Sequence, residues 1–249
     1  MDENLLDVEG LSKKFGGLHV LNNISLSVGR GELVGLIGPN GAGKTTLFNA
    51  VSGMIKPDSG KIIYAGRNIT GLAPHRVARL GLRRTFQLVN PFLTMSVLEN
   101  VMVSFIFGRS VKKDDSKGNT RTRCTEYLKV VGLEGKEDLP AGRLPIGQLR
   151  SLEIARALAG SPKILLADEV LAGLNEVEIT EKLDLFKKLN EEGLTILMIE
   201  HNLPAIMSTC RRVIVLVDGQ VIASGAPSEV VSQEEVITAY IGSESVFAS

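Results

Sequence analysis

The 249-residue sequence has no tryptophan and only two cysteines, Cys124 and Cys210, which stand far apart without a CxxC motif. This pattern rules out a disulfide framework, argues against a zinc site and is typical of a protein from a reducing compartment. The chain also lacks net charge, because 28 lysines and arginines balance 28 aspartates and glutamates. The composition gives no sign of a basic nucleic-acid binder, and we therefore expect no nucleic-acid partner.

Uninterrupted apolar runs are missing as well. A membrane span needs about 20 mostly apolar residues, and the nearest candidate, Thr85–Gly108, is broken by several polar residues and a proline. The acidic segment Met1–Gly10 is unlike the basic start of a signal peptide. We expect no targeting or membrane-spanning segment, while 44% hydrophobic residues are ample for a folded core.

Short β-branched runs alternate with longer helical patterns along the chain. The predicted strands are Val20–Val28, Leu33–Ile37, Ile62–Tyr64, Ile164–Ala167, Thr195–Ile199 and Val213–Val217. The predicted helices are Lys44–Ser52, Val97–Phe107, Thr122–Val131, Gln148–Ala159 and Glu178–Glu192. Runs that are apolar at every position indicate strands buried on both faces, which favours an α/β fold with a mostly parallel sheet covered by helices.

The middle third of the chain, residues 87–146, has a more helical pattern than its flanks. We expect a helical subdomain there, inserted into an α/β core formed by residues 1–86 and 147–249 within one domain. Inside it, Ser110–Arg123 is polar and densely charged, which predicts an exposed loop.

A glycine-rich segment lies between the predicted strand Leu33–Ile37 and a predicted helix. It fits the phosphate-binding pattern G-x-x-x-x-G-K-[ST] with Gly38, Pro39, Asn40, Gly41, Ala42, Gly43, Lys44 and Thr45. Glycines let backbone N–H groups turn toward phosphate oxygens, and the helix adds its positive N-terminal end. Lys44 supplies a full positive charge and Thr45 a hydroxyl ligand for Mg²⁺. A chance glycine-rich turn is the alternative, which this context makes the weaker reading.

The apolar run Ile164–Ala167 ends in two carboxylates, Asp168 and Glu169. Asp168 can hold Mg²⁺ indirectly, while Glu169 can polarise an attacking water molecule. Neighbouring strand residues point to opposite faces, so the pair can divide these roles. An exposed acidic turn is the alternative. Kinases, GTPases and many ATPases remain open at this point.

Seven segments in order resemble the ATP-binding subunits of ABC transporters, and the resemblance covers almost the whole chain. Besides the phosphate loop and the two carboxylates, they are Phe15 in KKFGG, Gln87 in RTFQ, Leu144–Gln148 (LPIGQ), Ala172–Asn175 (AGLN) and His201. The resemblance implies an adenine-stacking aromatic, a Q-loop glutamine, a signature motif, a D-loop and a switch histidine, in that order. Taken singly, Phe15 could be a core aromatic, Gln87 a surface residue and His201 a structural one.

The resemblance also implies a P-loop NTPase fold of the ABC type with an inserted α-helical subdomain and a small antiparallel β-sheet near the N-terminus. Its cofactors are ATP and Mg²⁺. Nucleotide binding then falls to Phe15, Gly38 to Thr46, Gln87, Gly147, Gln148 and Asp168. The resemblance assigns metal binding to Thr45, Gln87 and Asp168, and it assigns catalysis to Lys44, Gln87, Glu169 and His201.

Partners follow from the same resemblance. Two such domains, either copies of this chain or this chain and a related subunit, sandwich two ATP molecules head to tail. Integral membrane permease subunits bind the pair at the cytoplasmic face of the inner membrane, and an external substrate-binding protein acts indirectly. The permease surface is expected near Gln87–Phe107, where Phe92, Leu93 and Met95 form an apolar cluster, although subdomain core is an equal alternative for that cluster.

Within this family the sequence is similar to the branched-chain amino-acid importers. The similarity lies in RTFQ followed by PFLTMSVLENV, in AGLN, and in the C-terminal Ala239–Gly242. Related urea or amide uptake systems share much of this pattern. Two further alternatives are a non-transport ABC ATPase, whose tandem domains or coiled coils are missing here, and a small-molecule P-loop kinase, which would not explain the signature.

Two departures from the family pattern stand out. The common signature LSGGQ is LPIGQ here, so Pro145 replaces a serine hydroxyl and Ile146 a glycine. Gly147 and the helix behind it remain, which predicts a signature that binds phosphate less strongly. Val170 replaces a proline after Glu169, and nothing in the sequence explains that change.

Overall fold

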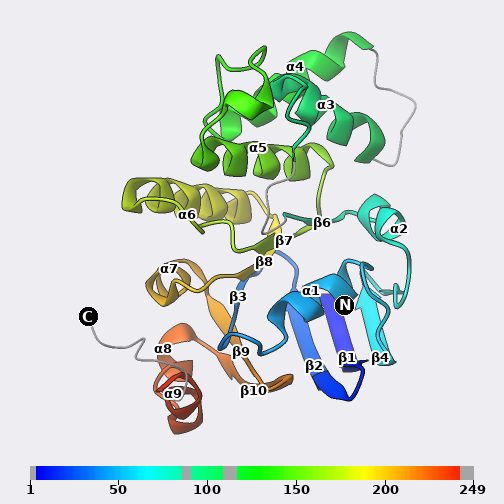
Figure 1. Cartoon of the computed structure of the whole chain (residues 1–249), viewed down its shortest axis with the longest axis vertical. Helices are drawn as coiled ribbons and strands as arrows, with labels where there is room; N and C mark the ends of the chain where they lie inside the picture. Colours follow the sequence, from blue (N-terminus) through cyan, green and yellow to red (C-terminus); the bar gives the residue numbers. More distant parts are fainter. Residues whose placement is uncertain (1–3, 86–90, 109–116, 242–249) are drawn as a thin grey trace.

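The computed structural model describes residues 4–85, 91–108 and 117–241 (Figure 1). Its centre is a six-stranded sheet in the order β10-β9-β3-β8-β7-β6. The strands are β3 (Leu33–Ile37), β6 (Leu82–Arg84), β7 (Ile164–Asp168), β8 (Thr195–Ile199), β9 (Arg212–Val217) and β10 (Gln220–Gly225). All neighbours pair in parallel except β9 and β10. The prediction of a mostly parallel sheet is therefore confirmed, and every residue of β3, β7 and β8 is buried.

A second, antiparallel sheet in the order β2-β1-β4-β5 lies beside the first. It consists of β1 (Asn4–Phe15), β2 (Leu18–Gly29), β4 (Ser59–Tyr64) and β5 (Arg67–Asn68). Helix α1 (Lys44–Val51) buries Leu47 and Phe48 in a core shared by both sheets. The expected small antiparallel sheet is present, and it fixes the helix that follows the phosphate loop.

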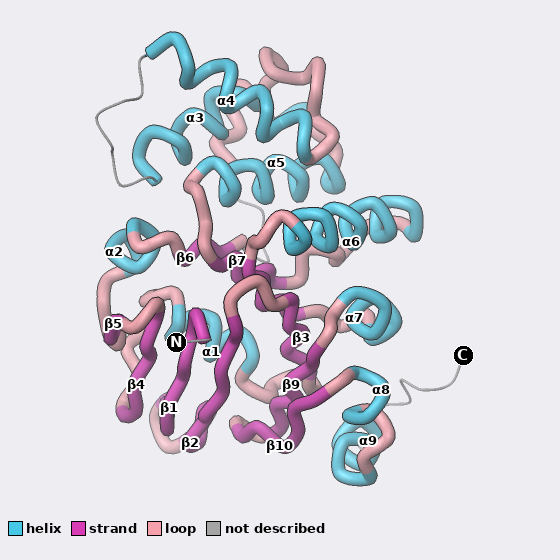
Figure 2. Tube along the Cα trace, turned by 180° about the vertical axis from the view of Figure 1, so that it is seen from behind, coloured by secondary structure: helices cyan, strands magenta, loops and turns pink. Residues whose placement is uncertain are grey.

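Three helices, α3 (Val97–Gly108), α4 (Lys117–Val130) and α5 (Ile146–Ala159), form a layer of their own (Figures 1 and 2). The 3₁₀ turn η1 (Ala141–Arg143) precedes α5. Helix α5 packs on α3 and α4. The predicted boundary, which ends the helical subdomain at residue 146 and assigns most of α5 to the α/β core, stays a prediction. Helices α6 (Glu176–Glu191) and α7 (Leu203–Thr209) share a core with α5 on one face of the parallel sheet, and α1 packs on the opposite face. Helices α2 (Pro74–Arg79), α8 (Pro227–Val230) and α9 (Glu234–Ile241) complete the described fold.

The prediction of a loop over Ser110–Arg123 is wrong from Lys117 onward, because α4 begins there. Polarity indicates exposure, and exposure is compatible with a helix whose other face is buried. Here Cys124 and Leu128 are fully buried in the helical layer, and the Arg123 guanidinium lies 5.5 Å from the centre of the Phe105 ring. These contacts on the following turns stabilise the polar first turns as helix.

The apolar cluster of the helical layer is partly at the surface. Phe92 and Leu93 are 45% and 54% exposed, whereas Met95 is half-buried. The Arg156 guanidinium lies 5.2 Å from the centre of the Phe92 ring. Among the described residues, no helix combines the length and the apolar character that crossing a membrane requires.

Candidate nucleotide site

The phosphate loop connects the end of β3 to the start of α1, and two of its glycines are required by geometry. Gly43 has φ 101°, and a Cβ there would lie 2.6 Å from the carbonyl oxygen of Val20. A Cβ on Gly38 would overlap the carbonyl of Leu216. Since α1 has no side-chain cap at Gly43, its first N–H groups face the loop and can receive an anion.

Lys44 is held inside the loop. Its side chain is buried, and its Nζ donates hydrogen bonds to the carbonyl oxygens of Gly38 at 2.6 Å and Pro39 at 2.9 Å. Burial lowers the pKa of Lys44, while the negative charges of Glu169 and Asp168 oppose that shift. The ammonium group is therefore fixed near the loop amides, with carbonyl partners that a phosphate can replace.

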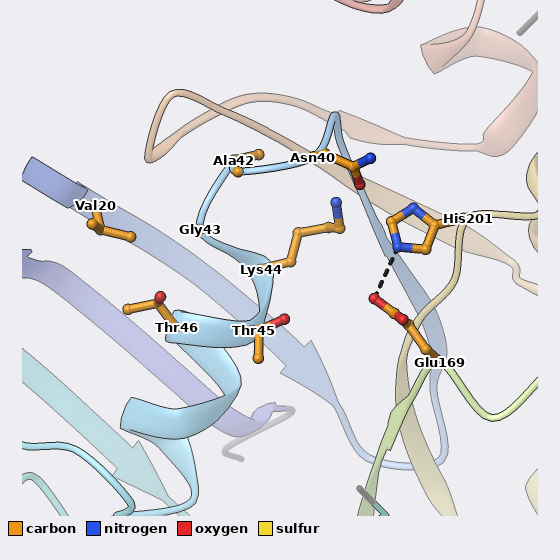
Figure 3. A pocket seen from close by; sticks show the side chains of 10 residues that line it. Val20, Asn40, Ala42, Gly43, Lys44, Thr45, Thr46, Glu169 and His201 are labelled. Atoms are coloured by element: carbon orange, nitrogen blue, oxygen red, sulfur yellow. Dashed lines mark hydrogen bonds and ion pairs between the residues drawn. The ribbon is translucent and has the colours of Figure 1, made fainter. Parts of the chain in front are cut away.

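A pocket of about 220 Å³ opens over this loop (Figure 3). It is lined by Val20, residues 40 to 46, Glu169 and His201. Figure 3 shows the side chains of Lys44, Glu169 and His201 converging on the same space. Val20 was missed by the sequence reasoning, which recognises it only as a strand residue.

Glu169 and His201 come from the ends of two paired parallel strands, β7 and β8. The His201 Nε2 and the Glu169 Oε1 lie 2.8 Å apart (Figure 3). Glu169 has φ 48°, and its N–H donates to the carbonyl of Ile199 at 2.9 Å. A non-glycine residue in this left-handed region is strained, and such strain is typical of functional sites. The structure thus brings the predicted water-activating carboxylate and the predicted switch histidine together.

Asp168 is completely buried at the end of β7. Its Oδ2 accepts a hydrogen bond from Arg84 Nη2 at 2.6 Å, and its backbone N–H donates to Thr85 Oγ1 at 3.1 Å. Burial raises the pKa of Asp168, and the Arg84 guanidinium opposes that shift. Its other oxygen, Oδ1, is buried and has no hydrogen-bond partner among the described residues. Asp168 does not line the pocket, but its charge acts on the pocket residue Lys44. Its unpartnered carboxylate oxygen fits a ligand for Mg²⁺ or for a water molecule bound to it.

The sequence reasoning missed two charged residues that support these groups, Arg84 and Glu200. Arg84 stands inside RTFQ, where only the glutamine was singled out. Glu200 is buried next to His201, and its Oε1 accepts a hydrogen bond from the N–H of Leu171 at 3.0 Å. Burial raises the pKa of Glu200 to about 7, with a smaller contribution from the charge of Glu169. The signal that could have found Glu200 was an acidic residue between a buried strand and the predicted switch histidine.

Phe15 and the signature Leu144–Gln148, which the structure describes, are not part of the pocket lining. Phe15 is 50% exposed at the β1–β2 turn, and Lys13 Nζ lies 5.5 Å from the centre of its ring. Pro145 is the N-cap of α5 without a side-chain hydrogen bond, Ile146 is 49% exposed, and Gly147 is buried against the carboxylate of Glu178. Gln148, next in the signature, is half-buried, and Gln87 lies outside the described residues.

The D-loop residue Asn175 has a structural role in this chain. Its Oδ1 accepts from the N–H of Glu178, and the Glu178 carboxylate accepts from the N–H of Asn175, both at 3.0 Å. This reciprocal capping box begins α6. Glu178 also lies directly behind Gly147. The signature and the D-loop are therefore packed together.

A parallel sheet that carries a glycine-rich loop, a buried lysine and two strand-end carboxylates defines a P-loop nucleotide-binding protein. Residues 21–172, more than half of the chain, match the model of the ABC transporter family, and residues 220–246 match that of the branched-chain amino acid ATP-binding cassette transporter. The chain belongs to the ABC transporter family of ATP-binding cassettes.

Individual relatives agree with this assignment. The high-affinity branched-chain amino acid transport ATP-binding protein LivG of Salmonella typhimurium is 39% identical over 97% of this chain and 99% of its own length. Among solved structures, the ADP conformation of an ATP-binding cassette of an ABC transporter is 31% identical, with a TM-score of 0.85 over 96% of this chain and 99% of that one. A dimeric cassette bound to ADP and Pi is 29% identical, with a TM-score of 0.81 over 89% of this chain and 98% of that one.

Proposed function

We propose that this chain is the ATP-binding and ATP-hydrolysing subunit of an importer for branched-chain or other hydrophobic amino acids. The observation that carries the substrate class is the near full-length similarity to a LivG protein, to which the match of residues 220–246 adds independent support. Related urea or amide uptake is the second candidate, because such systems share much of the sequence pattern of this subfamily.

The residues of the pocket divide the chemistry between binding and catalysis. Lys44 and the loop amides bind the β- and γ-phosphates, Thr46 and Asn40 line the same loop, and Phe15 stacks on the adenine. Thr45, Asp168 and Gln87 would hold Mg²⁺, directly or through water. When bound, this ion neutralises phosphate charge that develops during hydrolysis.

Glu169 accepts the proton of the attacking water, since its carboxylate faces the pocket. His201 orients that carboxylate through the 2.8 Å contact and lies where it can reach the γ-phosphate. Buried Glu200 holds the backbone after Glu169 through Leu171. Together these contacts fix the base relative to the phosphate loop before substrate arrives.

A second chain is proposed to complete the site. The pocket is lined by the phosphate loop and the ends of β7 and β8, whereas the signature Leu144–Gln148 does not line it. We infer that the start of α5 meets a phosphate across an interface with another cassette. Permease subunits would contact exposed Phe92 and Leu93, an external binding protein would deliver the amino acid, and the complex would sit at the cytoplasmic face of the inner membrane.

The test is uptake of radiolabelled leucine by cells in which the gene is deleted and restored. Loss of leucine uptake on deletion, with recovery by the wild-type gene and none by its Glu169→Gln variant, is the expected result. Loss of urea or amide uptake instead would favour the second candidate. Co-purification with ribosomes or DNA rather than with membrane proteins would contradict a transport role.

A further inference from the structure

The short strand β6 places two consecutive arginines, Arg83 and Arg84, where the helical layer meets the parallel sheet. Successive side chains on a strand point to opposite faces. The two guanidinium groups accordingly reach different parts of the molecule, although only one peptide bond separates their backbones.

Arg84 faces the nucleotide site. Its Nη2 donates to Asp168 Oδ2 at 2.6 Å, and its Nη1 donates to Asn49 Oδ1 at 2.6 Å and to Ser52 Oγ at 3.3 Å. Asn49 lies in α1 and Ser52 caps its C-terminal end. One side chain that is only 6% exposed thus ties the strand that carries Asp168 to the helix that carries Lys44.

Arg83 faces the helical layer. Its Nη2 donates to the carbonyl oxygens of Gly108, the last residue of α3, and Gly160, the C-cap of α5, the latter at 3.2 Å. Helix C-termini carry partial negative charge, so one cation there stabilises both ends. A Cβ on Gly160 would overlap the guanidinium, and one on Gly108 would lie 2.8 Å from Nη2. The two glycines make room for this contact.

We propose that Arg83 and Arg84 are positioning residues that couple the charge at Asp168 to the ends of α3 and α5. The inference rests on the proposed ATP function. Asp168 divides its negative charge between Arg84 and any cation at Oδ1, so cation binding weakens its pull on Arg84. A shift of Arg84 moves the backbone of β6, and Arg83 passes this displacement to both helix ends. Because coupling is reciprocal, changing Arg83 must alter the effect of Mg²⁺ on nucleotide affinity.

The experiment measures, by calorimetry on the full chain, the affinity for a non-hydrolysable ATP analogue with Mg²⁺ and with EDTA. The ratio of the two affinities is compared among the wild type, Arg83→Met, Arg83→Lys and the matched control Arg76→Met on the exposed face of α2. Arg83→Met releases β6 from the helix ends, so we expect a larger ratio than in the wild type. Arg83→Lys keeps the charge, so its affinity ratio should lie between those of Arg83→Met and the wild type. Arg76→Met should have the wild-type ratio.

Hydrogen exchange of the wild type with and without the Mg²⁺-bound analogue supplies a second measurement. Amides in the last turns of α3 and α5 should change their exchange rates when the analogue binds. Unchanged ratios in both Arg83 variants, unchanged exchange in the wild type, or an equal change in Arg76→Met would each overturn the coupling. Failure of the wild type to bind the analogue at all would instead overturn the proposed function, and the inference with it.

Discussion

Removing the Lys44 ammonium group tests the nucleotide site most directly. Lys44 is only 6% exposed and is fixed by two carbonyl oxygens of the phosphate loop. Lys44→Met keeps the length of the side chain and deletes the charge. A hydrogen bond to a charged group contributes about 1.5–3 kcal/mol, and 1.4 kcal/mol corresponds to a tenfold change in equilibrium constant. We therefore expect the Kd for Mg²⁺-ATP to rise by about ten- to a hundredfold.

The matched control for this substitution is Lys182→Met. Lys182 is 7% exposed on α6, burial lowers its pKa as it does for Lys44, and it does not line the pocket. Titration calorimetry on folded protein, checked by circular dichroism, should show wild-type affinity for the control. Equal affinities of Lys44→Met and the wild type would refute the assignment, as would an equal loss in the control.

Three further outcomes follow from the same geometry. Glu169→Gln should bind ATP but release phosphate about 10²- to 10⁴-fold more slowly, because the amide cannot accept the proton; wild-type turnover would show that another group is the base. Pro145→Ser combined with Ile146→Gly should raise the ATPase rate of the isolated chain about tenfold or more by restoring a donor to a charged oxygen, and no gain would mean that the existing backbone already compensates. Burial raises the pKa of Glu200 from 4.5 to about 7, so its contribution to stability is full below pH 4.5 and is lost as pH rises through 7. Glu200→Gln should be the more stable protein at about pH 8, by at most about 3 kcal/mol, and lose this advantage in acid; urea unfolding with identical pH profiles for both proteins would contradict this.

The buried parallel strands could be predicted because short, mostly apolar runs favour strands that are buried on both faces. Leu33–Ile37 has no polar side chain, Thr195–Ile199 has four apolar residues after Thr195, and the two runs occupy β3 and β8 with the predicted bounds. β1 was missed because its twelve residues include adjacent lysines and a glycine, and its pairing with β2 contains register shifts. Local pattern fails where irregular pairing with neighbouring strands decides the structure.

In the candidate site too, contiguous motifs could be predicted from the sequence, whereas contacts between residues far apart in the sequence could not. The phosphate loop is contiguous, so its motif could be recognised from the sequence alone. Glu169 and His201 meet because each follows the end of one of two paired parallel strands. Arg84 was not readable, because its partners Asp168 and Asn49 lie far from it in sequence. Nothing in the structure explains Val170, which is buried where the family pattern has proline.

Every charged group proposed for the pocket already has a partner within the chain. Lys44 is bound by loop carbonyls, Glu169 contacts His201, and Asp168 is paired with Arg84. The free energy of nucleotide or metal binding is therefore the difference between the new contacts and the internal contacts that they replace. This difference keeps the binding free energy of a single chain small. At the start of α5, the N-cap residue Pro145 makes no side-chain hydrogen bond, and the carboxylate of Glu178 lies behind Gly147. Contact of that helix end with a nucleotide held by a second chain adds phosphate interactions that a single chain does not make, so the proposed dimer is where ATP gains the affinity that drives a conformational change.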